Sequence, residues 1–178
     1  MTGFKGTRDG VTAVFDRREA VVVRGLVGQV VELVVADLPT PDAGSLAAMI
    51  GISDGAEEPD DPVLARLLPD GYRDDPDAAR EFRRFTESGL RTAKVECAQT
   101  VLATLPAAGG EVSLTQDQAE AWLRSLNDVR LALGVRLGIT EDDAELDDGS
   151  PDDDIRYAYI MLYHWLTDLQ GSLVAALS

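Results

Sequence analysis

The sequence has few of the residues that most often carry out chemistry: its 178 residues include one cysteine and one histidine. A single cysteine excludes a disulfide within the chain and a zinc site built from several cysteines. A single histidine excludes every site that needs two imidazoles. The chain also lacks the G-x-G-x-x-G, P-loop, G-x-S-x-G and C-x-x-C patterns. We therefore expect no catalytic residues, no cofactor and no metal site, and a protein that is not an enzyme.

Basic residues are also scarce, with 16 lysines and arginines against 32 aspartates and glutamates and a formal net charge of −16. The segments 53–62 and 140–154 hold 14 of the 32 acidic residues and no basic residue, so the rest of the chain is nearly neutral. Clustered like charges resist packing, and both segments are predicted to be acidic loops. Because DNA affinity depends on contacts of lysine and arginine with phosphate, we expect no direct DNA binding by the isolated chain.

Long hydrophobic runs are missing as well. The most apolar stretch, residues 20–38, is interrupted by Arg24, Gln29, Glu32 and Asp37, whereas a membrane span needs about 20 mostly apolar residues. The N-terminus has no apolar segment typical of a secretory signal. We expect a cytoplasmic protein with a free thiol and no membrane partner.

Two short segments at the N-terminus predict a β-hairpin. Residues 4–9 and 11–15 flank Asp9-Gly10, a dipeptide typical of tight turns between strands. Such a short hairpin needs helices to pack against.

Helical patterns cover most of the remaining chain. Asp16, Asp75 and Thr115 are predicted N-caps, and Pro76 suits the first position of a helix. We expect four long helices over residues 16–37, 75–105, 115–137 and 155–177, with short helices over 42–52 and 62–68. The predicted fold is mainly α (α+β), with an N-terminal β-hairpin followed by a helical bundle, and residues 1–178 form a single domain.

Periodicity also predicts which faces are buried. In residues 16–37 the polar positions Arg24, Gly28 and Glu32 leave a wide apolar face, so this helix lies centrally or faces a partner subunit. Two further apolar stripes are predicted to face the core. They are Leu90, Ala93, Cys97, Val101 and Leu105 in one helix, and Trp122, Leu126, Val129 or Leu133, and Leu137 in the next.

Three groups of residues have both a structural and a functional interpretation. Cys97 is a small core residue or, with Lys94 three positions earlier, a redox-sensitive thiol. His164, in an aromatic segment, is a structural histidine unless a nucleophile lies near it. Asn127, Asp128 and Arg130 interrupt an apolar helix and must be paired if they face inward, with Arg91 or Arg156 as candidate partners of Asp128.

Basic residues gather on one side of the helix over residues 75–105. They form either a charged outer face with pairs at i,i+4 or a binding patch for an acidic protein partner. The candidate partner-binding residues are Arg80, Arg83, Arg84, Arg91 and Lys94.

Several stretches together carry a family resemblance. They are residues 61–94 (DPVLARLLPDGYRDDPDAAREFRRFTESGLRTAK), 101–106 (VLATLP), 121–143 (AWLRSLNDVRLALGVRLGITEDD) and the closing YHWLTDLQGSLVAAL. They resemble an actinobacterial family of formerly unknown function whose characterised member is an oxidative-stress regulator. The resemblance implies redox-responsive transcriptional regulation through an extracytoplasmic-function sigma factor. The characterised member senses oxidation through two closely spaced cysteines, and this chain has only Cys97.

Two functions follow as hypotheses, and a third is kept for comparison. The first is a non-enzymatic regulatory protein that acts through a sigma-factor partner. The alternative is a helical protein-interaction module or homodimer linked to proteolysis or sulfur metabolism. The third, an enzyme without a recognisable motif, requires a polar pocket near His164 and Asp128.

Overall fold

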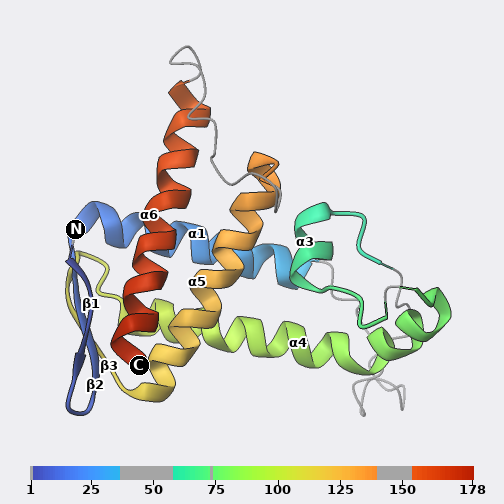
Figure 1. Ribbon diagram of the computed structural model, residues 1–178, viewed down its shortest axis with the longest axis horizontal. Coiled ribbons are helices and arrows are strands. Elements are labelled where there is room, and N and C mark those ends of the chain that lie inside the picture. Colours follow the sequence, from blue (N-terminus) through green and yellow to red (C-terminus); the bar gives the residue numbers. More distant parts are fainter. Residues whose placement is uncertain (1, 37–57, 73, 140–153) are drawn as a thin grey trace.

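The computed structural model describes residues 2–36, 58–72, 74–139 and 154–178. A small sheet lies at one end, α5 and α6 run beside it, and α1 and α4 extend away from it (Figure 1). The mainly α fold with an N-terminal hairpin is confirmed, while the predicted helix over 42–52 and residues 53–57 and 140–153 of the two acidic segments lie outside the described residues. The elements, in chain order, are β1 (Thr2–Thr7), β2 (Gly10–Phe15), α1 (Arg17–Ala36), α3 (Pro62–Leu67), α4 (Pro76–Thr104), β3 (Gly110–Leu114), α5 (Gln116–Leu137) and α6 (Asp154–Leu177).

The sheet has three antiparallel strands in the order β1-β2-β3. Thr7 pairs with Gly10, so the hairpin loop consists of Arg8 and Asp9, and the prediction of Asp9-Gly10 was one residue too late. Gly10, with a φ of +153°, instead opens β2 at a point where a Cβ atom would lie 1.9 Å from the carbonyl oxygen of Leu114. Glycine is required there by the close approach of β3.

The third strand was not predicted. Residues 110–114 were interpreted only as a connection between helices, but they pair with β2 along its length, from Val11 opposite Leu114 to Phe15 opposite Gly110. Val112 and Leu114 are buried in the core, whereas Glu111 and Ser113 are exposed. Alternation of apolar and polar residues is typical of a β-strand, and this pattern was present in the sequence of residues 110–114.

An aromatic cluster joins the sheet to the helices. The ring of Trp122 lies 5.5 Å from that of Phe4 and 5.7 Å from that of Phe15, measured between centroids. The indole Nε1–H donates to Oγ1 of Thr104 at 2.8 Å, so this fully buried side chain has its hydrogen bond. The predicted inner face of α5 is confirmed, because all five of its residues are buried.

The C-terminal half of α6 lies against β1. The backbone N–H of Phe4 donates to Oγ of Ser172 at 3.0 Å. A Cβ atom on Gly3 would come within 2.7 Å of the Ser172 side chain, so only glycine permits this approach. In the described ranges, no helix has the combination of length and apolar character needed to cross a membrane.

Local capping fixes where the helices begin, as predicted. Asp16 accepts from the N–H groups of Arg18 and Glu19, while the Glu19 carboxylate accepts from the N–H of Asp16. Asp75 accepts from the N–H groups of Asp77 and Ala78 at the start of α4, and Thr115 and Gln118 form a reciprocal cap at the start of α5. These contacts involve residues no more than three positions apart, and for that reason they can be predicted from sequence.

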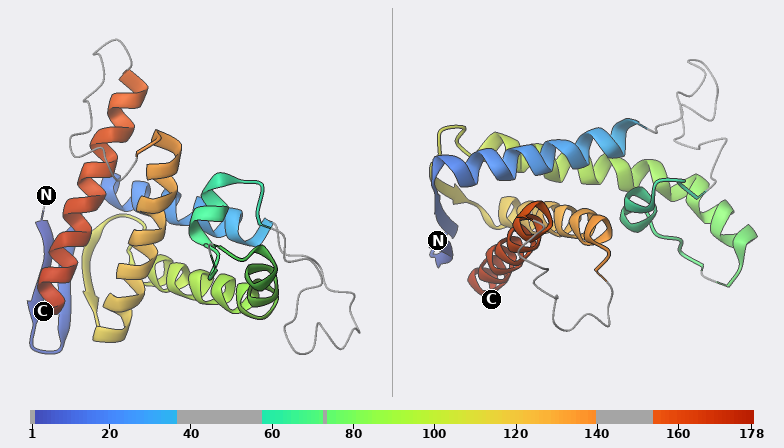
Figure 2. Two further views of the ribbon diagram at one scale, coloured as in Figure 1. Left: turned by 45° about the vertical axis from the view of Figure 1, so that its right-hand side comes forward. Right: turned by 90° about the horizontal axis from the view of Figure 1, so that it is seen from above.

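Helix α1 lies along α4 (Figure 2), and Arg24 of α1 reaches the C-terminal end of α4. Nη1 of Arg24 donates to the carbonyl oxygens of Leu102 and Leu105, at 2.8 and 2.9 Å, near the C-terminus of α4. These carbonyls have no partner within the helix and lie at its negative end, so they suit a cation. Arg24, one of the polar positions noted in the sequence of this helix, is therefore engaged by α4.

The buried face of α4 is rotated from the predicted one. Val101 and Leu105 are buried as expected, but Leu90 and Ala93 are exposed and Cys97 is only half-buried. Arg83 and Arg91 face inward in the first half of the helix. Apolar periodicity placed the inner face incorrectly because the inward positions of this half are occupied by arginines.

Candidate functional site

The basic residues of α4 point in two directions. Arg83 and Arg91 are only 6% and 3% exposed, whereas Arg80 and Arg84 lie in solvent. Lys94 is also largely buried. The five residues predicted to bind a partner therefore do not form one exposed strip. Three of them are engaged inside the molecule, because carboxylates and backbone carbonyls there accept their hydrogen bonds.

Glu87 lies between the two buried arginines. Its Oε1 atom accepts from Nε of Arg91 at 2.8 Å and lies 2.7 Å from Nη2 of that residue. Its Oε2 atom lies 3.4 Å from Nη1 of Arg83. One carboxylate thus serves two buried cations, an arrangement in which each hydrogen bond is charge-assisted.

The same arginines hold α4 to other parts of the chain. Arg83 pairs with Asp70 and donates to the carbonyl oxygen of Leu68 at 3.2 Å, both just after α3. Arg91 donates to the carbonyl oxygen of Val34, in the last turn of α1, at 2.5 Å. We call Arg83, Glu87 and Arg91 the buried arginine cluster.

The same helical turns also carry exposed apolar side chains. Phe82 packs edge-on against Tyr72, with ring centroids 5.8 Å apart. Gly71 allows this contact, because a Cβ atom there would lie 2.8 Å from the Phe82 ring. We call three exposed residues the α4 apolar surface, with the exposed fraction of each in parentheses: Tyr72 (51%), Phe82 (43%) and Phe85 (59%).

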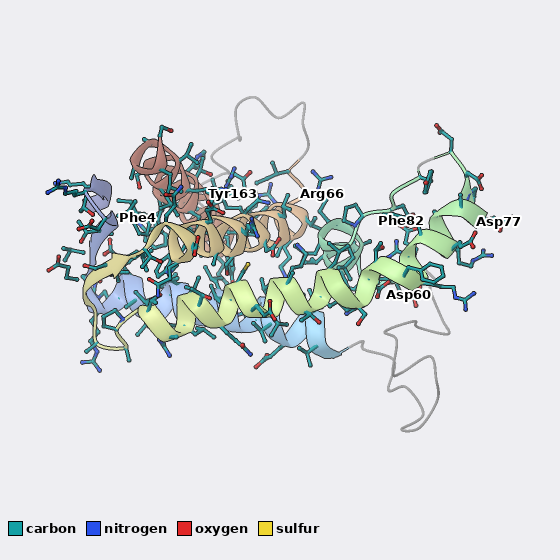
Figure 3. The ribbon with its side chains drawn as sticks, turned by 90° about the horizontal axis from the view of Figure 1, so that it is seen from below. Phe4, Asp60, Arg66, Asp77, Phe82 and Tyr163 are labelled. Atoms are coloured by element: carbon teal, nitrogen blue, oxygen red, sulfur yellow. The ribbon has the colours of Figure 1, made fainter. Side chains whose placement is uncertain are left out.

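Charged residues border this surface. Arg80 and Arg84 are exposed beside Phe82 and Phe85, and Nη1 of Arg80 lies 3.2 Å from Asp77. In Figure 3 the end of α4 that carries Asp77 and Phe82 extends beyond α1 and α5. Exposed aromatic side chains next to arginines, on an extended helix end, are typical of a protein-binding surface.

A second ion pair lies in the middle of α4. Nζ of Lys94 is 2.6 Å from Oδ1 of Asp128, a buried residue of α5. Asp128 is therefore paired, as expected of an inward polar group, but with Lys94 rather than Arg91 or Arg156. Burial raises the pKa of the Asp128 carboxyl above its usual value, and the hydrogen bond and charge of Lys94 act in the opposite direction.

Cys97 and His164 have no catalytic setting within the part of the chain that is described. Cys97 is a free, half-buried thiol one turn after Lys94, whose ammonium group is engaged by Asp128. His164 is exposed, and its ring packs edge-on to Tyr163 at 6.3 Å. None of the three grooves lined by residues of α4 and the α3–α4 connection, of α3, α5 and α6, or of α1, α5 and α6 contains His164 or Asp128. In the same ranges, no group of three or more histidine, cysteine, aspartate or glutamate side chains is placed to hold a metal ion.

Known proteins resemble this chain over nearly its whole length. The family model described as "Domain of unknown function (DUF2017)" matches residues 1–177. The oxidative stress regulators AosR of Mycobacterium tuberculosis and Mycobacterium bovis are 36% identical to it over 187 aligned positions, which cover 96% of this chain and 84% of theirs. A relative from Mycobacterium leprae is 36% identical over 89% of this chain and 78% of its own. No solved structure matches the chain.

The buried arginine cluster predicts a large effect of a small change at Glu87. Glu87→Gln keeps the shape of the side chain but removes the charge shared by Arg83 and Arg91. Because breaking a buried ion pair leaves an uncompensated charge, we expect the free energy of unfolding to fall by about 3 kcal/mol in urea denaturation. Glu81→Gln, at an exposed position of the same helix, is the control and should change it by less than about 0.5 kcal/mol. Equal effects of the two variants would contradict the assignment.

The raised pKa of Asp128 predicts a particular pH dependence of stability. A carboxyl whose pKa is higher in the folded state binds more protons there, so protonation stabilises the fold. This contribution to stability is complete below the unfolded-state pKa, about 3.9. It is lost as the pH rises through the folded-state pKa. We therefore expect the stability of the wild type, relative to that of Asp128→Asn, to decrease from acid pH toward neutrality. Urea denaturation of both proteins across that pH range measures the difference in their free energies of unfolding. A difference that stays constant or increases with pH would refute the prediction.

Proposed function

The chain belongs to the family described as domain of unknown function DUF2017, and on that premise we propose that it is a non-enzymatic regulator of the oxidative-stress response. In this proposal it acts in the cytoplasm by binding a protein of the transcription machinery, a sigma factor. It changes the availability of that partner and does not contact DNA itself, which agrees with its net charge of −16.

The observation that supports a binding role is the α4 apolar surface. A helix usually buries its apolar side and exposes its charged side, but these turns of α4 bury Arg83 and Arg91 and expose Phe82 and Phe85. Leaving two phenylalanines in water costs free energy that a partner recovers by covering them. Aromatic residues with neighbouring arginines also contribute much of the affinity in many protein interfaces.

The exposed arginines give the surface its expected specificity. Arg80 and Arg84 are placed to contact acidic side chains at the rim of a partner, where charge affects the association rate and the choice of partner more than the final affinity. Arg83, Arg91 and Lys94 contribute indirectly, because their internal contacts hold α4 in place.

The relatives' name supports the stress-response part of the proposal. Two of them carry the name oxidative stress regulator and are 36% identical to this chain over 96% of its length. Cys97, the only cysteine, is the one thiol through which this chain itself can respond to oxidants.

A homodimer linked to proteolysis or sulfur metabolism is the second candidate. Exposed valines on α1, namely Val21, Val22 and Val35, support it, because they leave part of the apolar character of this helix uncovered. A second copy of the chain would bury them.

A direct binding measurement tests the proposal. We expect the full chain to bind a purified extracytoplasmic-function sigma factor from its own organism, and Phe85→Ser to weaken that binding at least tenfold, as expected for a central interface aromatic. Phe85 is 59% exposed, so its replacement should leave folding intact. Met161→Ser, at an exposed position of α6, is the matched control and should bind like the wild type.

The outcomes separate the candidates. Binding that is lost in Phe85→Ser and unchanged in Met161→Ser supports the regulator, and a change with oxidation that Cys97→Ser abolishes supports its redox response. Binding that is absent, or equal in all variants, contradicts the assigned surface. If the same samples sediment as a monomer at high concentration, the homodimer hypothesis is excluded.

A further inference from the structure

An open groove of about 270 Å³ lies between α3, α5 and α6, away from the α4 apolar surface. Its polar lining comes from Arg66, Asn127, Arg130 and Tyr163, and Leu131 and Val135 form part of its apolar wall. In Figure 3 Arg66 and Tyr163 lie on the same side of α5. The groove thus combines two cations with an apolar surface.

Arg130 is held in a defined position by α6. Its Nε atom donates to Oγ1 of Thr167 at 3.1 Å, and its Nη1 atom donates to Oε1 of Gln170. Its guanidinium carbon lies over the ring of Tyr163, 5.4 Å from the centroid. These three contacts fix the guanidinium before any ligand arrives, which lowers the entropic cost of binding.

Within the described residues, no carboxylate neutralises the charge of Arg130. All three partners of Arg130 are uncharged, and neither Arg130 nor Arg66 forms an ion pair with any carboxylate in the described ranges. The buried cations of α4, in contrast, each have a carboxylate partner. The groove therefore brings together two arginines that have no carboxylate partner in the described ranges.

We propose that this groove binds the carboxylate group of a small organic acid. Arg130 and Arg66 donate to the carboxylate, since guanidinium groups match its planar geometry, and the Asn127 amide supplies a further donor. Leu131 and Val135 contact the carbon skeleton. The volume lies near the lower end of the range for small-molecule sites, about 300–1,000 Å³, and suits a compact metabolite. This inference is independent of the proposed sigma-factor binding.

Binding of two small probes to the full chain tests the proposal. Sodium benzoate carries a carboxylate on an apolar ring, and benzamide has the same shape without the charge. We expect benzoate to produce saturable shifts of NMR signals from Arg130 and Tyr163, and benzamide to bind at least tenfold more weakly because it lacks the charge-assisted hydrogen bonds.

Variants of exposed arginines provide the matched comparison. Arg66→Gln should weaken benzoate binding about tenfold, whereas Arg124→Gln, which removes the same charge from an exposed position of α5 outside the groove, should leave it unchanged. Because both side chains are exposed, neither variant is expected to unfold the protein, and the NMR spectrum of each verifies this.

The remaining outcomes overturn the proposal. They are benzoate shifts that do not saturate, shifts that map outside the groove, or equal weakening by both variants. Inorganic phosphate that binds as tightly as benzoate would show that the groove takes oxyanions without regard to a carbon skeleton, which also overturns it.

Discussion

The position of α4 depends on one carboxylate shared by two buried arginines. Glu87 accepts from both Arg83 and Arg91, which in turn reach the chain after α3 and the last turn of α1. Burying ions is costly unless each has a partner with good geometry. The cluster meets that condition through side-chain and backbone acceptors, and it joins segments that are distant in sequence. The main effect of the cluster is therefore to fix the position of α4, and its net contribution to stability is secondary.

This placement determines which side of α4 faces outward. Because the arginines occupy inward positions, Phe85 and Phe82, which packs against Tyr72, remain exposed. The result is an exposed apolar surface on a helix that is held firmly, and such a surface loses little conformational entropy when a partner binds. The proposed regulatory role rests on this arrangement, together with the similarity of the chain to oxidative stress regulators.

Features controlled by neighbouring residues could be predicted from the sequence. The caps at Asp16, Asp75 and Thr115 fixed the helix starts, because each cap bonds to backbone groups within three positions. The inner face of α5 followed from an unbroken apolar period around Trp122. The existence of the hairpin also followed from local patterns, although its loop was placed one residue too late.

Features that depend on distant partners could not be predicted in this way. Arginines are typical of the exposed face of a helix, so the sequence did not predict that Arg83 and Arg91 are buried. Their burial is favourable because Asp70 and the carbonyl oxygens of Leu68 and Val34 accept their hydrogen bonds. The pairing of Lys94 with Asp128 joins positions 34 residues apart. The groove at Arg130 requires three helices at once. Strand β3 differs from these cases, because its alternating pattern was visible but short.

Hydrogen exchange along α4 tests the central claim most directly. If the buried arginine cluster holds this helix in the free protein, the backbone amides of residues 80–90 should exchange far more slowly than in an unstructured peptide, with protection comparable to that of residues 94–101. Exchange of residues 80–90 at nearly the unprotected rate, beside a protected second half, would contradict the account. It would show that the α4 apolar surface is not preformed.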